Sequence, residues 1–62
     1  MTNQEIKEIM RKSRFFDYEI AAAIGISEYT FCKWFRRDLT EEQQGRILTA
    51  ISTLKAGEKH EN

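Results

Sequence analysis

The strongest constraint on the fold is a run of three residues, Gly25, Ile26 and Ser27, which carries the signals for the end of one helix and the start of another. Glycine is favoured just after a helix because it adopts a positive φ without a steric penalty. Serine is favoured just before a helix because its hydroxyl oxygen accepts a hydrogen bond from a free backbone N–H. A three-residue turn that contains glycine is typical of a helix-turn-helix, although many helical hairpins contain a glycine as well. The sequence therefore predicts a helix-turn-helix between Asp17 and Arg37.

Helix-start signals also mark the other predicted helices. Thr2 is followed three residues later by Glu5, and Thr40 by Gln43, which is the spacing of a capping box. Asp17 is expected to cap the helix that precedes the turn. Apolar residues follow these signals at the intervals of an amphipathic helix. We therefore expect four helices, at residues 3–13, 17–24, 28–37 and 41–56.

The chain is large enough for only one domain. It has 62 residues, a size at which a single hydrophobic core gives marginal stability. Hydrophobic residues make up 40% of the sequence and charged residues 32%, and proline is absent, which is typical of a compact helical domain. We therefore predict an all-α bundle of four short helices at residues 1–57, with Gly57 ending the last helix and a polar tail at residues 58–62.

The residues that the sequence lacks disfavour several classes of protein. Cys32 has no second cysteine for a disulfide, and together with His60 it cannot supply the about four ligands of a structural zinc site. No apolar run approaches the roughly 18 residues of a membrane-spanning helix. No catalytic triad, paired carboxylates or phosphate-binding glycine loop is recognisable. We expect a cytoplasmic protein that is not an enzyme and that uses no metal or cofactor.

The third predicted helix separates into two faces when its residues are laid out at 100° per residue. Phe31, Trp34 and Phe35 fall within about 100° of arc, and we expect this side to be buried. The opposite side carries Tyr29, Cys32, Lys33 and Arg36. Arginine and lysine donate hydrogen bonds to O6 and N7 of guanine, and a small side chain fits against a thymine methyl group. The outward side therefore has the chemistry of a surface that reads DNA bases.

The run EIAAAIGISEYTFCKWFRRDL, at residues 19–39, resembles the helix-turn-helix of the Cro and phage-repressor class, also called the XRE-like family. It looks closest to the very small members that phages and integrative elements carry. The resemblance implies a sequence-specific regulator of transcription that binds double-stranded DNA with its third helix in the major groove. The residues that it places in the core are Ala21, Ile26, Phe31 and Trp34. The residues that it places on DNA are Ser27, Glu28, Tyr29, Thr30, Cys32, Lys33 and Arg36.

The basic residues have a plainer interpretation as well. Ten Lys and Arg side chains balance ten Asp and Glu side chains, whereas nucleic-acid binders usually carry a basic surplus. Basic residues also suit the C-terminal end of any helix, because their positive charge interacts favourably with the negative end of the helix dipole. This applies to Lys33, Arg36 and Arg37. Arg37 points more sideways than the other two, which favours a phosphate over a base. The first helix has three basic residues that are either ordinary exposed side chains or contacts to the DNA backbone: Arg11, Lys12 and Arg14.

Three other residues of the predicted DNA-facing set leave alternatives open. Glu28 either stabilises the first turn of its helix through the helix dipole or accepts a hydrogen bond from cytosine. Cys32 is either a small side chain that fits the groove or a redox-active thiol. Tyr29 reads a base, touches a phosphate or packs across the turn.

Two features outside the motif also allow more than one interpretation. Phe15 and Phe16 cannot both belong to the core of so small a domain, so one of them, with Tyr18 beside it, is a candidate partner surface. Gly45 lies inside the fourth predicted helix, where glycine costs about 1 kcal/mol relative to alanine. It is either simply tolerated there or marks the close passage of a neighbouring helix.

Two functions remain in competition. The first is a transcriptional regulator of a phage or mobile element that binds duplex DNA, with the start of the second helix facing phosphate. A neutral chain binds DNA weakly as one copy, so we expect a symmetric homodimer on two half-sites. The second is a helix-turn-helix used as a protein-interaction module, such as an antirepressor or an antitoxin-like partner.

Overall fold

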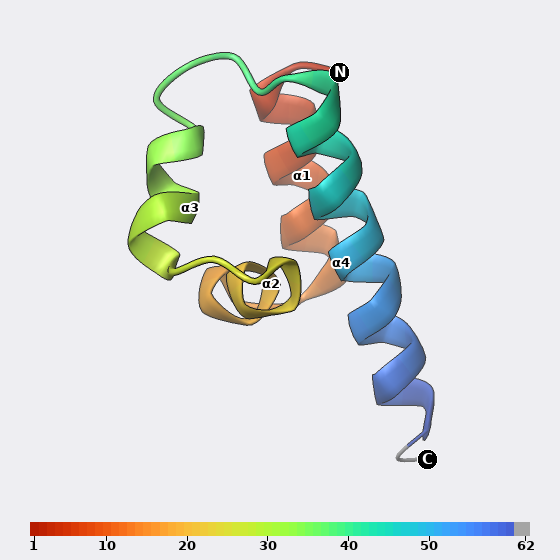
Figure 1. The fold of residues 1–62 in the computed structure, drawn as a ribbon. Helices are drawn as coiled ribbons and strands as arrows, with labels where there is room; N and C mark the ends of the chain where they lie inside the picture. The colour runs from red at the N-terminus through yellow and green to blue at the C-terminus, as the bar shows by residue number, and fades with distance from the viewer. Residues whose placement is uncertain (61–62) are drawn as a thin grey trace.

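The protein folds into four helices, as predicted. The computed structural model describes residues 1–60, with the side chains of residues 1–57, and the described part is entirely helix, turn and loop. The helices are α1 (Asn3–Ser13), α2 (Asp17–Ile24), α3 (Glu28–Trp34) and α4 (Glu41–His60) (Figure 1). The first two helices have the predicted bounds. The all-α prediction is therefore confirmed, and the differences lie at the ends of α3 and α4.

The four helices are arranged around α4. Figure 1 shows α1 and α4 side by side and running in the same direction, with α2 crossing near the end of α1. α4 packs against both α1 and α2, whereas α3 packs mainly on α2. The segment between α3 and α4 returns across the top of the view in Figure 1 to the start of α1. α3 is consequently the outermost of the helices, held by α2 at one end and by this returning segment at the other.

Reciprocal side-chain hydrogen bonds begin α1 and α4, as the spacing predicts. The Thr2 hydroxyl oxygen accepts from the Glu5 backbone N–H at 3.1 Å, and the Thr2 N–H donates to the Glu5 carboxylate at 2.7 Å. At α4 the Gln43 N–H donates to the Thr40 hydroxyl oxygen at 3.1 Å, and the Thr40 N–H donates to the Gln43 side chain at 3.0 Å. Both capping boxes are confirmed.

The prediction that Asp17 caps α2 is wrong. Phe16 occupies the capping position, with extended backbone angles, and Asp17 is the first helical residue. The Glu19 carboxylate accepts a hydrogen bond of 2.8 Å from the Phe16 backbone N–H. A capping box consists of two reciprocal hydrogen bonds. Glu19 supplies the one that uses only the backbone N–H of the capping residue, so a phenylalanine can occupy that position. Asp17 still lies where the helix dipole favours an acidic residue.

α3 ends at Trp34 and not at Arg37 as predicted. The Phe35 N–H donates to the Cys32 carbonyl oxygen at 3.2 Å, and the Arg36 N–H donates to the Lys33 carbonyl oxygen at 3.1 Å. These bonds span three residues and not four, so the chain leaves the helix through a tightened last turn. The chain must turn here because Leu39, which is only 6% exposed, has to reach the core.

α4 is longer than predicted. It passes through Gly57 and extends to His60, so the expectation that Gly57 ends it is wrong; residues 61–62 of the expected tail lie outside the described residues. Glycine lowers helix stability by about 1 kcal/mol but still adopts helical angles. The close-neighbour interpretation of Gly45 is also wrong, because a Cβ at this position meets no atom within 4 Å.

One hydrophobic core joins all four helices. Its buried members are Ile6, Met10, Ile20, Ala21, Phe31, Leu39, Ile47, Ala50 and Ile51. Phe31 is the only buried residue from α3, and it is 1% exposed. α3 therefore depends on a single deeply buried anchor, supported by partly buried neighbours.

Candidate nucleic-acid interface

The turn between α2 and α3 has the geometry that its sequence predicts. Gly25 has a φ of +97°, and its N–H donates to the Ala21 carbonyl oxygen at 2.9 Å. The Ile26 N–H donates to the same oxygen at 3.0 Å. The Ser27 hydroxyl oxygen accepts from the Thr30 N–H at 3.1 Å and thereby caps α3. The turn is thus closed by backbone bonds on one side and a side-chain cap on the other, which fixes the path of α3 relative to α2.

Three aromatic side chains determine which side of α3 faces inward. The Phe31 ring lies 5.3 Å from the Phe35 ring in an edge-to-face arrangement and 6.0 Å from the Trp34 ring. Trp34 and Phe35 are half-buried and pack against the core. Edge-to-face aromatic pairs are favourable beyond the area that they bury. The aromatic cluster confirms the buried side predicted for this helix.

The predicted DNA-facing residues lie on the outside of the molecule. Thr30 is half-buried. The other seven residues are exposed: Ser27, Glu28, Tyr29, Cys32, Lys33, Arg36 and Arg37. Tyr29 is 67% exposed, and the Lys33 ammonium lies 4.8 Å from the centre of its ring. A cation over an aromatic ring restrains both side chains while leaving the charge in place. Tyr29 therefore packs against its own helix neighbour and does not cross the turn.

Arg36 and Arg37 project from the segment after α3 and not from the helix itself. This segment is held by Asn3, the first residue of α1. The Asn3 amide nitrogen donates to the Arg37 carbonyl oxygen at 2.7 Å, and its amide oxygen accepts from the Leu39 N–H at 2.8 Å. Gln44 adds a bond of 3.0 Å to the Leu39 carbonyl oxygen. Asn3, a residue of α1, thus holds the segment that follows α3 in place. No feature of the sequence singles out Asn3 for this role.

The basic residues of α1 differ in their surroundings. The Arg11 guanidinium forms an ion pair with Glu8, and this contact holds the pKa of the Glu8 carboxyl below its ordinary value. The Lys7 ammonium lies 5.4 Å from the centre of the Phe35 ring. Lys12 and Arg14 are exposed, and Arg14 ends α1 with a φ of +67°. Among the basic residues of α1, Lys7 is therefore the one that contacts the Phe35 ring at the end of α3, although the sequence does not single it out.

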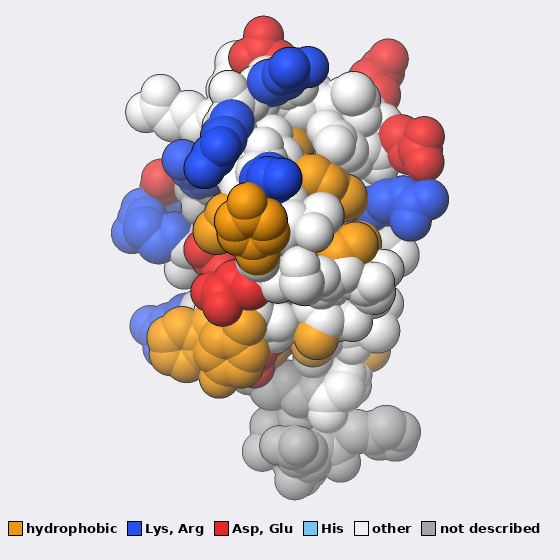
Figure 2. Space-filling view, turned by 60° about the vertical axis from the view of Figure 1, so that its left-hand side comes forward, with side chains coloured by type: hydrophobic (Ala, Val, Ile, Leu, Met, Phe, Trp, Pro, Cys, Tyr) orange, Lys and Arg blue, Asp and Glu red, His pale blue; other side chains and the backbone are white. Residues whose placement is uncertain are grey.

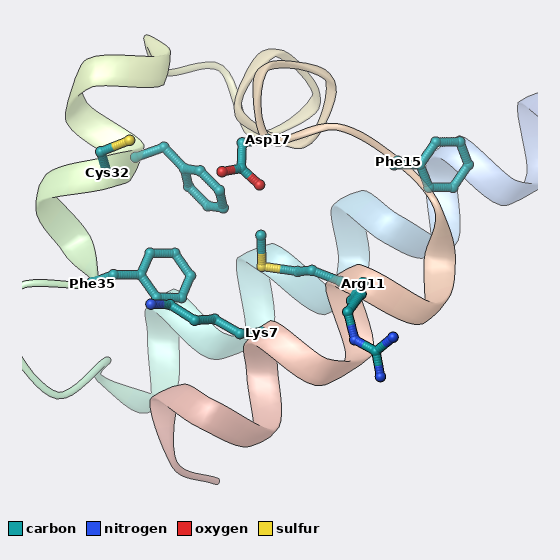
Figure 3. A pocket seen from close by; sticks show the side chains of 8 residues that line it. Lys7, Arg11, Phe15, Asp17, Cys32 and Phe35 are labelled. Atoms are coloured by element: carbon teal, nitrogen blue, oxygen red, sulfur yellow. The ribbon is translucent and has the colours of Figure 1, made fainter.

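A groove of about 530 Å³ separates α1 from α3 (Figure 3). Met10, Phe31 and Phe35 line it with apolar surface. In Figure 3, Lys7 lies beside Phe35, Asp17 lies toward α2, and the end of the Arg11 side chain points away from α3. The groove therefore has a cation, Lys7, beside Phe35 and a carboxylate, Asp17, toward α2, and the Arg11 side chain also contributes to its lining.

Acidic side chains surround the basic ones on the face that carries α3. Figure 2 shows several Lys and Arg side chains gathered at the upper left, with acidic side chains above and below them and large hydrophobic side chains further down. The first turn of α2 carries Asp17 and Glu19, and Glu28 begins α3. Carboxylates repel phosphate, so the acidic first turn of α2 disfavours the expected phosphate contact there.

An aromatic pair is exposed near the acidic end of this face. Phe16 and Tyr18 are 65% and 58% exposed, and their rings stack 5.6 Å apart with an angle of 9° between their planes. Phe15, by contrast, packs against the core. Only one of the two adjacent phenylalanines therefore packs against the core, as predicted from the sequence.

The residues that the structure describes contain neither a candidate metal site nor a candidate membrane span. No group of three or more His, Cys, Asp or Glu side chains that could hold a metal ion occurs among them. Within the same part of the chain, each helix is too short or too polar to cross a membrane. No family model matches the chain, and neither a curated protein nor a solved structure matches it.

Proposed function

We propose that this chain is a sequence-specific double-stranded DNA-binding protein that places α3 in the major groove, as a regulator of transcription in a phage or mobile element. One observation carries the proposal. Phe31 is buried, and this burial determines which side of α3 faces the core. The opposite side, with Tyr29, Cys32 and Lys33, therefore points outward. A helix with such side chains on its free face suits the width of the major groove.

The proposal gives the outward residues separate roles. Lys33 and Arg36 donate to guanine, and each such pair is worth about 1–3 kcal/mol of discrimination. Arg37, which follows the helix end, contacts phosphate. The resemblance to the Cro and phage-repressor class supports these assignments through the run at residues 19–39. With no net charge, one copy binds non-specific DNA weakly, so the proposed operator is contacted by two copies.

Selection of bound duplexes from a random pool tests the proposal directly. We expect one enriched sequence with two-fold symmetry, because a symmetric pair of copies reads both half-sites alike. On that duplex, Arg36→Ala and Lys33→Ala should each weaken binding about 5- to 150-fold for each bound copy, the range that 1–3 kcal/mol per contact implies. Lys55→Ala, an exposed residue of α4, is the matched control and should bind like the wild type. Wild-type binding by both α3 variants would contradict the proposal.

A protein-interaction module is the second candidate, and the exposed Phe16–Tyr18 stack is the observation that favours it. Contiguous exposed apolar surface on a soluble protein often marks a site of protein interaction. If the module binds a protein, Phe16→Ala and Tyr18→Ala should abolish capture of one stoichiometric partner, whereas Arg36→Ala should not. Absence of any enriched duplex together with this pattern would favour the second candidate over the first.

A further inference from the structure

We propose that Lys7 of α1 contacts a DNA phosphate beside α3, so that the DNA-facing surface spans the groove between the two helices. This inference rests on the proposed function and extends it to a helix outside the helix-turn-helix. The other basic residues of α1 are not assigned this role. The assignment follows from the geometry of Lys7 relative to Phe35 and Asn3.

Lys7 is directed toward the end of α3 by the helix that carries it. Asn3 lies four residues earlier, on the same face of α1, since residues four apart are neighbours on a helix. Asn3 bonds the carbonyl oxygen of Arg37, and the Lys7 ammonium lies 5.4 Å from the Phe35 ring centre. Both residues of α1 therefore face the same short segment, at residues 35–37. The proposed phosphate therefore lies beside Phe35, at the start of this segment.

The charge of Lys7 is available to a phosphate. Two ion pairs occur among the residues with described side chains, Arg11–Glu8 and Arg46–Glu42, and Lys7 belongs to neither. Lys7 is exposed, and its contact with an aromatic ring orients the ammonium without neutralising it. Arg11, one turn further along α1, is engaged by Glu8 and points away from α3 (Figure 3). Lys7 is thus the cation of α1 that the structure presents to DNA.

The polarity of the groove determines where the phosphate lies. Asp17 stands at the α2 end of the groove, where a phosphate would be repelled. Lys7 stands at the other end, beside Phe35. A DNA backbone therefore crosses the groove at the Lys7 end. This placement makes the C-terminal end of α3 the side of the motif that holds the backbone.

The salt dependence of binding tests the assignment, measured by fluorescence anisotropy on the duplex enriched from the random pool. Each phosphate neutralised contributes about 0.9 to the slope of log K against log salt concentration. We expect Lys7→Gln to lower that slope by about 1.8, because each of the two bound copies loses one phosphate contact, and we expect Lys7→Arg to restore it. Lys12→Gln removes the same charge from another face of α1 and should leave the slope unchanged. Equal slopes for Lys7→Gln and the wild type would overturn the inference.

Ethylation of single phosphates in the duplex gives a second readout. A Lys7→Gln variant that is merely less stable would bind all duplexes less well and would not become insensitive to one particular phosphate. One ethylated phosphate should weaken binding of the wild type but not of Lys7→Gln, since the variant no longer uses that phosphate. If no phosphate shows this pattern while the wild type binds the duplex, only the assignment of Lys7 fails. If the wild type enriches no duplex at all, the proposed function fails, and the inference fails with it.

Discussion

The side chain of Asn3 donates a hydrogen bond of 2.7 Å to the carbonyl oxygen of Arg37, 34 residues later in the chain. The same side chain accepts from the Leu39 N–H at 2.8 Å. One amide of α1 thus satisfies a donor and an acceptor of the segment that follows α3. Because this segment carries Arg36 and Arg37, the position of both arginines depends on a residue of the first helix.

Replacing Asn3 with alanine should therefore destabilise the protein. Two hydrogen bonds are lost and the backbone groups at residues 37 and 39 are left without these partners, so we expect a loss of about 1–3 kcal/mol in the free energy of unfolding. Urea denaturation measures it. Gln4→Ala, one residue away and exposed, is the control and should lie within about 0.5 kcal/mol of the wild type. Equal stabilities for the two variants would show that Asn3 is not an anchor.

Gly25→Ala should destabilise the turn. Gly25 has a φ of +97°, and a residue with a Cβ in this left-handed region costs about 1–2 kcal/mol. A Cβ at this position meets no atom within 4 Å, so the loss comes from the backbone alone. Thermal unfolding followed by circular dichroism measures the change. An unchanged melting temperature would contradict the φ value at this position.

Gly45→Ala should have the opposite effect. Gly45 lies inside α4 with open space around the position of a Cβ, so alanine adds helix propensity without a clash. The expected gain is about 1 kcal/mol, which raises Tm by about 4–8 °C in a domain of this size. The same circular dichroism experiment measures it. A fall in Tm would mean that a neighbouring segment does approach Gly45.

Acid should weaken the start of α1. The Thr2 backbone N–H, which bonds the Glu5 carboxylate, holds the pKa of Glu5 below its ordinary value. A pKa that is lower in the folded state stabilises the fold above the unfolded pKa, and this contribution is lost as the pH falls through the folded pKa. Carboxyl chemical shifts in an NMR titration report this pKa. Thr2→Ala retains the backbone N–H and should keep most of the shift, whereas a Glu5 pKa at or above its ordinary value in the wild type would refute the prediction.

Local sequence signals predict those parts of the fold that local physics decides. Thr2, Ser27 and Thr40 each cap a helix by accepting from the N–H of the residue three positions later, so their roles follow from spacing. Gly25 needs only its own backbone angles. The outward direction of Lys33 follows from the period of α3 and from Phe31 alone. These interactions lie within one or two helical turns, which is the range over which sequence patterns carry information.

Contacts between distant segments account for the differences. The C-terminal end of α3 depends on Asn3 and on the burial of Leu39, and neither leaves a pattern near Arg37. Lys7 belongs to the candidate site only because α1 packs where its side chain reaches Phe35. In the sequence it is one more lysine on an exposed helix face. The extent of the candidate site therefore depends on how separate helices pack. The periodicity of one helix carries no information about such packing.

The two sides of α3 have unequal freedom to change over evolutionary time. Tyr29, Cys32 and Lys33 are exposed and contribute nothing to the core, whereas Phe31 fills the centre of the molecule and Gly25 holds the turn. Substitutions on the outer side are therefore nearly neutral for folding. Descendants of one ancestral chain can diverge in what this surface recognises while they inherit the same scaffold, so the outer positions are expected to vary most among relatives of this chain.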